Sequence, residues 1–408
     1  MKIGLIGLGT VGQGVAEVLL EGSFPSISLI NVCDIDRKKA NIAPHIFTEN
    51  PNDILDNPEI DVVVELIGGI EPAKTYIKTA LSNGKDVVTA NKLLLCSCWK
   101  EIMSCVKDNG RKIRFEASVG GGIPIISSIN QALVANRISG IYGIINGTTN
   151  YILTKMFEEK RGFYEVLKDA QEKGFAEKDP SLDINGDDTL HKLFILSCLS
   201  FGKMVDIGSI YKEGISRIKG QDLLYADSLG YSIKLLGIAK ENNGSLEIRV
   251  HPAMISKDHL LSSVSYNYNG IYIIGDLTGP LLFYGQGAGS LPTTSAVIAD
   301  LLSLSSNEGF AIPDVKSVSC FLMDELKLRY YIRFMAIDKP GVLAMIFGVL
   351  AKNNISIESC IQKERGEVVP IIITTHETLE GNVIKAIEEI DKSPVIKEKT
   401  LTIRIEEI

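Results

Sequence analysis

Residues 2–20 read KIGLIGLGTVGQGVAEVLL: a short apolar run, three spaced glycines and then a helical pattern. The glycines are Gly7, Gly9 and Gly12, in G-x-G-x-x-G spacing. In a dinucleotide-binding turn the first glycine permits the tight turn, the second admits a pyrophosphate, and the third lets strand and helix pack closely. The following helix offers unpaired N–H groups to phosphates. The stretch predicts nucleotide binding, and a glycine-rich turn without a ligand is the alternative.

Alternating strand and helix patterns continue through the first 130 residues. Apolar runs typical of strands occur at residues 27–36, 61–68, 85–90 and 113–119. Helical stretches separate them. Such alternation predicts an α/β fold with a doubly wound parallel sheet.

The end of the second predicted strand bears on which nicotinamide cofactor is used. Asp34 lies 22 residues after Gly12, where an acid can bond the adenosine ribose, and Asp36 is the competing choice. Arg37 and Lys38 follow and could instead neutralise a 2′-phosphate. NAD and NADP therefore both remain open.

Two further strand ends carry candidate site residues. Asn91 and Lys92 come just past residues 85–90, and ligands bind beyond the carboxyl ends of such strands. Lys92 is thus a candidate for cofactor or substrate contact, against the alternative of a solvated lysine at a helix start. Glycines 120–122 follow Glu116. Their backbone carbonyls and the Glu116 carboxylate could cage a cation, or the glycines could form a flexible turn between domains.

Residues 174–193, GFAEKDPSLDINGDDTLHKL, hold five carboxylates and then a lysine that leads into an apolar run. The spacing does not fit a calcium-binding EF-hand loop. Asp188 and Lys192 are four residues apart and share one helix face. Because that helix is largely apolar, we expect Lys192 near the core with Asp188 beside it. A half-buried lysine next to an acid can move protons. An ordinary surface salt bridge is the alternative.

Composition narrows the class of protein. At 408 residues, two or three domains are expected. The net charge is −8 without a run of five basic residues, which argues against nucleic acid and anionic membranes as partners. No apolar stretch is long enough to predict a membrane span. Seven cysteines without a CxxC pair predict mostly buried, reduced thiols in a cytoplasmic protein.

Several motifs together resemble homoserine dehydrogenases. The acidic segment has that family's spacing from Gly174 to Lys192. Four further stretches resemble the family in the family's order: TANK (89–92), EASVGGGIP (116–124), NGTTNYIL (146–153) and GQGAGSLPTTSAV (285–297). The resemblance implies reversible NAD(P)-dependent oxidation of L-homoserine to L-aspartate 4-semialdehyde, a step towards threonine and methionine. It also implies a homodimer or homotetramer.

The resemblance also implies a three-part organisation. A Rossmann-type NAD(P)-binding domain is expected over residues 1–135, completed by about 288–320. An α+β domain for substrate binding and dimerisation is expected over 136–287. A regulatory domain is expected over 328–408.

Roles carry over from the family by position. Lys192 resembles the proton donor or acceptor at the 4-hydroxyl, and Lys92 a second active-site lysine. Substrate-binding residues implied in this way are Glu177, Asp183 and Asp188. Cofactor-binding residues so implied are Gly7, Gly9, Thr10, Val11, Gly12, Lys92 and Gly289. A sodium site is implied at Glu116, Val119, Gly121 and Ile123. One departure is Cys33, where the family often carries an arginine, and this weakens a strict NADP preference.

The last 80 residues restart the pattern as βαββαβ, a ferredoxin-like plan. The sequence DKPGVLAMIF (338–347) resembles the opening of ACT domains, which bind amino-acid effectors. The resemblance implies threonine as a possible effector, with residues 338–343 and 353–356 as candidates to bind it. The alternative is a dimerisation module without a ligand. For the whole chain, the alternative function is a non-catalytic amino-acid sensor that binds nucleotide, which the presence of Lys192 and Glu177 disfavours.

Overall fold

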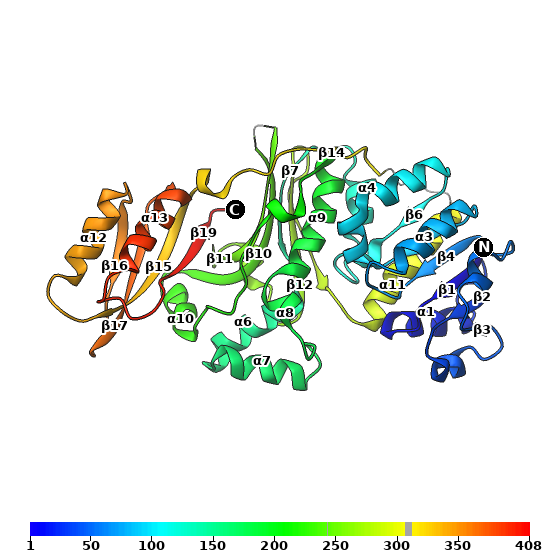
Figure 1. Cartoon of the computed structure of the whole chain (residues 1–408), viewed down its shortest axis with the longest axis horizontal. Coiled ribbons are helices and arrows are strands. Elements are labelled where there is room, and N and C mark those ends of the chain that lie inside the picture. Colours follow the sequence, from blue (N-terminus) through cyan, green and yellow to red (C-terminus); the bar gives the residue numbers. More distant parts are fainter. Residues whose placement is uncertain (243, 307–311) are drawn as a thin grey trace. The chain divides into compact units, whose positions relative to one another are not determined.

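The computed structural model describes residues 1–242, 244–306 and 312–408 (Figure 1). Its contacts group the chain into two compact units. The first unit comprises residues 1–147, 190–208 and 268–317, and the second comprises 148–189, 209–267 and 318–408. Each unit is described by itself.

The first unit is built on a six-stranded parallel sheet in the order β3-β2-β1-β4-β5-β6. Its strands are β1 (Lys2–Ile6), β2 (Ser28–Cys33), β3 (Phe47–Thr48), β4 (Val62–Glu65), β5 (Asp86–Thr89) and β6 (Ile113–Arg114). This 3-2-1-4-5-6 order is that of the Rossmann fold and confirms the predicted class. The central strands are buried on both faces, which explains their continuous valine-rich runs.

Helices cover this sheet on both sides (Figure 1). They are α1 (Thr10–Leu20), α3 (Ala73–Ser82), α4 (Lys92–Asp108) and α11 (Ser290–Ser306). Helix α1 packs against α11, and α3 packs against α4. Val15 of α1 and Val297 of α11 are fully buried in one core with the β1 side chain Leu5. A helix near residue 300 thus completes a sheet that begins at residue 2.

The first unit also contains three antiparallel strands in the order β13-β12-β7. They are β7 (Ile138–Ile144), β12 (Tyr268–Gly275) and β13 (Gly279–Gln286). The helix α9 (Asp187–Phe201) enters this unit from residue 190. Trp99 of α4 lies edge-on to Phe194 of α9 and to Phe115, with ring centroids 6.4 and 5.8 Å away. Aromatic packing thus fixes α9 against α4.

The second unit combines a β-hairpin with helices. The hairpin strands are β10 (Tyr231–Asn242) and β11 (Ser245–Ser256), and the short strand β9 (Tyr211–Lys212) pairs parallel with β11. Its helices are α6 (Gly147–Glu159), α7 (Phe163–Glu172), α8 (Ser181–Ile184) and α10 (Gly220–Ser228).

The C-terminal part of the second unit has the predicted βαββαβ order. The elements are β15 (Lys327–Ile337), α12 (Val342–Lys352), β16 (Ile357–Ile361), β17 (Val368–Thr375), α13 (Glu380–Ile390) and β19 (Leu401–Glu406). Tyr330, Ile332 and Phe334 alternate along β15 into a core that includes residues of α12 and α13. The strand β19 pairs antiparallel with β15 and parallel with β11. This continuation of the C-terminal sheet into the hairpin was not predicted.

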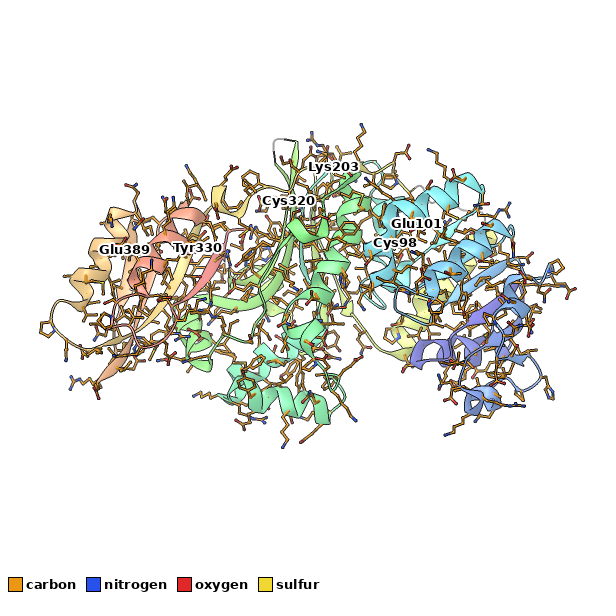
Figure 2. All side chains as sticks on the ribbon, viewed as in Figure 1. Cys98, Glu101, Lys203, Cys320, Tyr330 and Glu389 are labelled. Carbon is orange, nitrogen blue, oxygen red and sulfur yellow. The ribbon has the colours of Figure 1, made fainter. Side chains whose placement is uncertain are left out.

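Two sequence predictions on general class meet the structure here. Within the described residues no helix is long and apolar enough to cross a membrane. All seven cysteines are free thiols, but only Cys33, Cys96 and Cys198 are buried. The prediction of mostly buried thiols is therefore wrong, because four side chains reach the surface at least in part, including Cys98 and Cys320 (Figure 2).

Candidate active site

The glycine turn joins β1 to α1 through very close backbone contacts. Gly7 has a φ of +103°, and its N–H donates to the Cys33 carbonyl at 2.8 Å. A Cβ on Gly12 would lie 1.9 Å from the Gly7 carbonyl oxygen. A Cβ on Gly9 would meet no atom within 4 Å. The turn itself requires Gly7 and Gly12, whereas Gly9 leaves open space beside the first turn of α1.

A cavity of about 370 Å³ lies against this turn and is lined by residues from the ends of β1, β2 and β4. Asp34 lines it and is buried. The Asp34 carboxylate accepts from the Leu8 N–H at 2.7 Å, the Asp36 N–H at 2.9 Å and Lys39 Nζ at 3.0 Å. Burial opposes ionisation, yet these donors lower the pKa of Asp34 below its ordinary value. A carboxylate is therefore held in the cavity.

Asp36 and Arg37, also candidates for contact with the adenosine ribose or its phosphate, do not line this cavity. Asp36 caps the short helical turn η1 (Arg37–Ile42) by accepting from the Lys38 N–H at 3.1 Å. Arg37 is highly exposed and faces Glu49 at 3.7 Å. The basic side chain that lines the cavity is Lys39, which sequence reasoning missed. The sequence feature that could have identified Lys39 is its position five residues after Asp34, on the helical turn capped by Asp36.

Beyond β4 and β5 a buried polar network shapes the turn that leads to Lys92. Glu65, at the end of β4, accepts from the Thr89 hydroxyl at 2.6 Å and from the Ile67 N–H at 2.9 Å. The Thr89 hydroxyl accepts from the Asn91 N–H at 3.0 Å, and Asn91 caps α4. Burial raises the pKa of Glu65, although its donors oppose the shift. Lys92 is thus the first residue of a fixed, half-buried helix start.

Sequence reasoning did not single out Glu65. The signal was a single acid at the end of an otherwise apolar strand.

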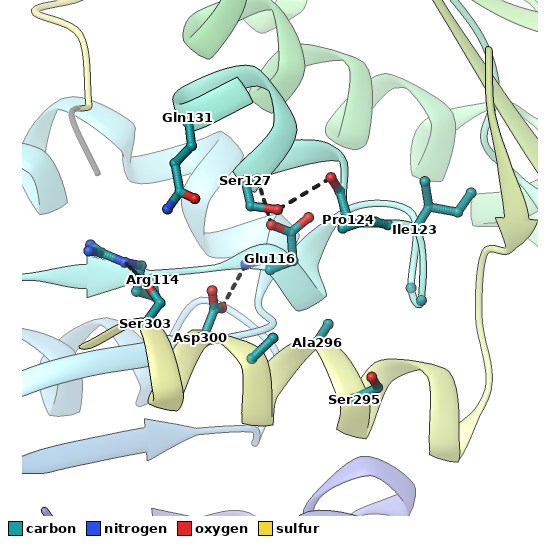
Figure 3. Close-up of a pocket in the computed structure, with 13 residues that line it drawn as sticks. Arg114, Glu116, Ile123, Pro124, Ser127, Gln131, Ser295, Ala296, Asp300 and Ser303 are labelled. Carbon is teal, nitrogen blue, oxygen red and sulfur yellow. Dashed lines mark hydrogen bonds between the residues drawn. The ribbon is translucent and has the colours of Figure 1, made fainter. Parts of the chain in front are cut away.

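Glu116 is buried, and its carboxylate is tied to the short helix α5 (Ile125–Ser127), which follows the glycine loop (Figure 3). One carboxylate oxygen accepts from the Ile126 N–H at 2.9 Å and the other from the Ser127 N–H at 2.7 Å. The Glu116 N–H donates to Asp300 of α11 at 2.8 Å (Figure 3). Burial raises the pKa of both carboxyl groups. These residues line a cavity of about 240 Å³ together with Gly121 and Ile123.

The segment after β13 returns to both glycine regions. The Gly122 N–H donates to the Gln286 carbonyl at 3.1 Å, and a Cβ on Gly121 would lie 2.6 Å from the Gly287 carbonyl carbon. The Ser290 hydroxyl donates to the Thr10 carbonyl at 3.0 Å. Gly289 therefore lies directly before the point where this segment meets the glycine turn.

Lys192 is buried, with 8% of its surface exposed, on the second turn of α9. Its Nζ donates to the Ile145 carbonyl at 2.8 Å, just past the end of β7. This burial confirms the expectation that Lys192 lies near the core. The backbone carbonyl fixes the direction of the amine, and Asp188 stands one turn earlier on the same helix.

The five acids of residues 174–193 separate by environment. Glu177 and Asp179 are exposed, Asp183 is half-buried and Asp188 is buried. Asp179 accepts from the N–H of Ser181, the first residue of α8, at 3.1 Å, and Asp187 pairs with Lys212. Asp179 and Asp187 therefore shape the turn itself. The Glu177 carboxylate is exposed, so a ligand can reach it.

The two groups of candidate effector residues lie at opposite ends of α12. Residues 338–343 lead into this helix, and residues 353–356 follow it. Eleven helical residues span about 16 Å. One small amino acid cannot touch both groups within a single C-terminal domain.

Family models match almost the whole chain. The description "Homoserine dehydrogenase, NAD binding domain" matches residues 7–116, "Homoserine dehydrogenase" matches 124–302, and "ACT domain" matches 330–392. The chain is 40% identical to a homoserine dehydrogenase of Neisseria gonorrhoeae, over 100% of this chain and 99% of that protein. It is 36% identical to one of Bacillus subtilis, over 100% of this chain and 98% of that protein.

Solved structures give the same likeness. A homoserine dehydrogenase from Thiobacillus denitrificans is similar with a TM-score of 0.93 and 42% identity, covering 100% of this chain and 98% of that chain. A hyperthermophilic archaeal homoserine dehydrogenase in complex with NADPH is similar with a TM-score of 0.65 and 26% identity, covering 76% of this chain and 98% of that chain.

Proposed function

The chain belongs to the homoserine dehydrogenase family, and we propose that Lys192 transfers the proton in its reaction. The protein is an NAD(P)-dependent oxidoreductase that interconverts L-homoserine and L-aspartate 4-semialdehyde. Its C-terminal ACT domain fits regulation by an amino acid. No observation favours the alternative of a non-catalytic sensor.

The buried amine of Lys192 is the observation that carries this proposal. A bound nicotinamide would supply the acceptor for the hydride that leaves C4 of homoserine. The hydroxyl on the same carbon must then lose its proton. Lys192 accepts that proton, and the Ile145 carbonyl aims its Nζ. Lys92 begins α4, just after the carboxyl end of β5. It is the second proposed active-site lysine and contacts cofactor and substrate.

The proposed homoserine ligands are acids of the segment that leads into α9. Glu177 and Asp183 receive the substrate ammonium, because an ammonium group is best held by carboxylates. Asp188 orients the same site from the first turn of α9. The exposure of Glu177 and the partial exposure of Asp183 support this assignment, since a ligand carboxylate must be open to its ligand.

The cavity at Asp34 is the proposed seat of the adenosine ribose, with the pyrophosphate at the glycine turn and Thr10 and Val11. The open space beside Gly9 supports the close approach of a phosphate. Lys39 supplies the positive charge for a 2′-phosphate, although Arg37 and Lys38 were the residues expected from sequence. Gly289 closes this site at Thr10. Asp34 suits the free 2′-hydroxyl of NAD and Lys39 suits the 2′-phosphate of NADP, so both cofactors are proposed.

A sodium ion is the further proposed component, held by the Glu116 carboxylate and the backbone carbonyls of Val119, Gly121 and Ile123. The donor set fits such an ion in kind, since every ligand is a hard oxygen. In the described part of the chain, no group of three or more His, Cys, Asp or Glu side chains could hold a metal. The ion would therefore depend on backbone carbonyls.

Three broader assignments complete the proposal. Threonine is the proposed effector of the C-terminal domain, bound by residues 338–343 or 353–356. A binding site that uses both groups requires two copies of the domain, since α12 separates them in one copy, and this supports a homodimer or homotetramer. The third proposed assignment is a cytoplasmic location, which the seven free thiols support because thiols stay reduced there.

The variant Lys192→Ala tests the central assignment. We expect kcat for homoserine oxidation to fall about 10³-fold while the NADP dissociation constant stays unchanged. Lys85→Ala is a matched control, because Lys85 is equally buried and its Nζ donates to the carbonyls of Asn57 and Ile60. Lys85 lies at the amino end of β5, whereas ligands of such sheets bind beyond the carboxyl ends of the strands. A Lys192→Ala enzyme with the kcat of Lys85→Ala would remove Lys192 from its role.

A further inference from the structure

The last strand of the chain carries a buried arginine into the hairpin that borders the acidic segment. In β19, Arg404 stands opposite Ala253 of β11 and opposite Tyr330 of β15. Its side chain is 4% exposed. Strand pairing on both sides fixes its backbone, and burial leaves its guanidinium little room to move.

The guanidinium of Arg404 joins the C-terminal domain to β9 and the residue after it. Two of its nitrogens bind the Glu380 carboxylate of α13. Nη1 donates to Glu213 Oε2 at 3.0 Å, and Nη2 donates to the Tyr211 hydroxyl at 2.9 Å. The Tyr211 hydroxyl donates in turn to Glu213 Oε2 at 2.9 Å. Arg404 thus fixes both Tyr211 and Glu213 in one closed set of hydrogen bonds.

Residues 211–215, which we call the bracket segment, lie against the turn between α8 and α9. The Ile215 N–H donates to the Ile184 carbonyl at 2.9 Å. A Cβ on Gly214 would lie 2.1 Å from that same oxygen, so the two backbones are in direct contact. Lys212 pairs with Asp187. These contacts flank the turn at its start and its end, next to Asp183 and Asp188.

We infer that Arg404 is a positioning residue of the homoserine site, which it orders from the C-terminal domain through Glu213 and the bracket segment. The inference rests on the proposed roles of Asp183 as a homoserine ligand and of Asp188 in orienting the same site. Those two acids flank the turn that the bracket segment holds. The C-terminal domain is then part of the apparatus that fixes the substrate ligands, and is not only a seat for an effector.

The contacts of Glu213 explain why it is suited to transmit this restraint. Its N–H donates to the Val250 carbonyl of β11 at 2.8 Å, and its side chain is 20% exposed. With its backbone tied to β11 and its carboxylate tied to Arg404, the residue orients Gly214 and Ile215 against the turn. Loss of either charge releases one end of this arrangement. The ligands of homoserine then lose order, while the proton chemistry of Lys192 does not change.

The test compares homoserine kinetics of Arg404→Lys and Glu213→Gln in the full-length protein. Each change loses charge-assisted hydrogen bonds, and we expect KM for homoserine to rise about tenfold with kcat nearly unchanged. Arg333→Lys is the matched control. Arg333 is an equally buried arginine of β15 that binds Asp222 of α10 at 2.7 Å. Its replacement should lower the melting temperature by a similar amount and leave KM unchanged.

Because Arg404→Lys leaves Glu380 with a poorer partner, the variant could fail to fold, and Glu213→Gln then decides alone. The double variant should raise KM no further than the larger single change, since both act on one interaction. Unchanged KM in Glu213→Gln, or an equal rise in Arg333→Lys, overturns the inference. A wild-type protein without homoserine turnover would instead refute the proposed function, so the two failures are distinguishable.

Discussion

The glycine turn at residues 7–12 and the acidic turn at residues 183–188 are held by different forces. At the glycine turn, backbone touches backbone: Gly7 contacts Cys33 at the end of β2 and Leu66 just after β4. At the acidic turn, a backbone contact between Ile215 and Ile184 is joined by ionic side chains, one of them supplied by Arg404 almost 200 residues after the bracket segment. The first arrangement fixes room for a ligand, and the second fixes the direction of charges.

This difference separates what substitutions in the two regions should do. Added volume should harm the glycine turn, because its function depends on how closely a phosphate can approach. Altered charge should harm the acidic turn, because its function depends on carboxylates that receive an ammonium group. Cofactor kinetics should report on the first region and homoserine kinetics on the second.

Of the substitutions within these two turns, Asp183→Asn should have the largest effect, because it removes one charge from the acidic turn. We expect kcat/KM for homoserine to fall about 100-fold, because a charged ligand group loses its partner, with the KM for NADP unchanged. Asp179→Asn is the control in the same segment. Its carboxylate accepts from the Ser181 N–H, a bond that the asparagine oxygen can keep, so both the melting temperature and kcat/KM should stay nearly unchanged. Equal kinetic losses in both variants would contradict the assignment.

At the glycine turn, Gly9→Ala and Gly12→Ala should differ in kind. A methyl on Gly9 meets no atom of the protein, so the fold should tolerate it while the KM for NADP rises about 30-fold. A methyl on Gly12 would lie 1.9 Å from the Gly7 carbonyl oxygen, so this variant should unfold at a lower temperature. Thermal melting without cofactor and cofactor kinetics separate the two. Cofactor kinetics unaltered by Gly9→Ala would show that no phosphate approaches there.

Lys39→Ala probes a charge inside the first region. We expect the KM for NADP to rise about tenfold and that for NAD to stay within about twofold, because only NADP carries the 2′-phosphate. Arg37→Ala is the control, since Arg37 is exposed and faces Glu49. An equal rise for both cofactors would mean that Lys39 serves Asp34 and not the phosphate.

Outside the two turns, a pH dependence of stability is expected from Lys234, a buried lysine of the second unit. Burial lowers the pKa of Lys234 to about 8 from its ordinary 10.5. Between these values the unfolded chain binds the proton more tightly, so the stability contribution rises with pH across that window, by about 2–3 kcal/mol. Urea unfolding of wild type and Lys234→Met at pH 8 and pH 10 measures this. A parallel pH response in the two proteins would contradict it.

Glycine spacing and hydrophobic periodicity predicted those parts of the fold that are determined by residues near one another in the sequence. The spaced glycines and apolar runs predicted the parallel sheet, and the restart near residue 330 predicted the C-terminal βαββαβ order. The apolar helix around Lys192 predicted the burial of that lysine. Each of these signals lies within some 20 residues of the feature it predicts.

The remainder depends on partners that are far apart in sequence. Nothing near Glu213 indicates that Arg404 will bind it, and nothing near β11 indicates that β19 will pair with it. Lys39 was missed because its direction is set by Asp34 and by the helical turn that Asp36 caps. Such contacts are decided by how elements pack, and they escape a reading of periodicity and spacing.

The central claim is that the chain oxidises L-homoserine with a nicotinamide cofactor. Its most direct test is the initial rate of reduced cofactor formation by the wild-type protein with L-homoserine, measured separately with NADP and NAD. The account predicts a homoserine-dependent rate with at least one of the two cofactors. No homoserine-dependent rate with either cofactor would contradict it.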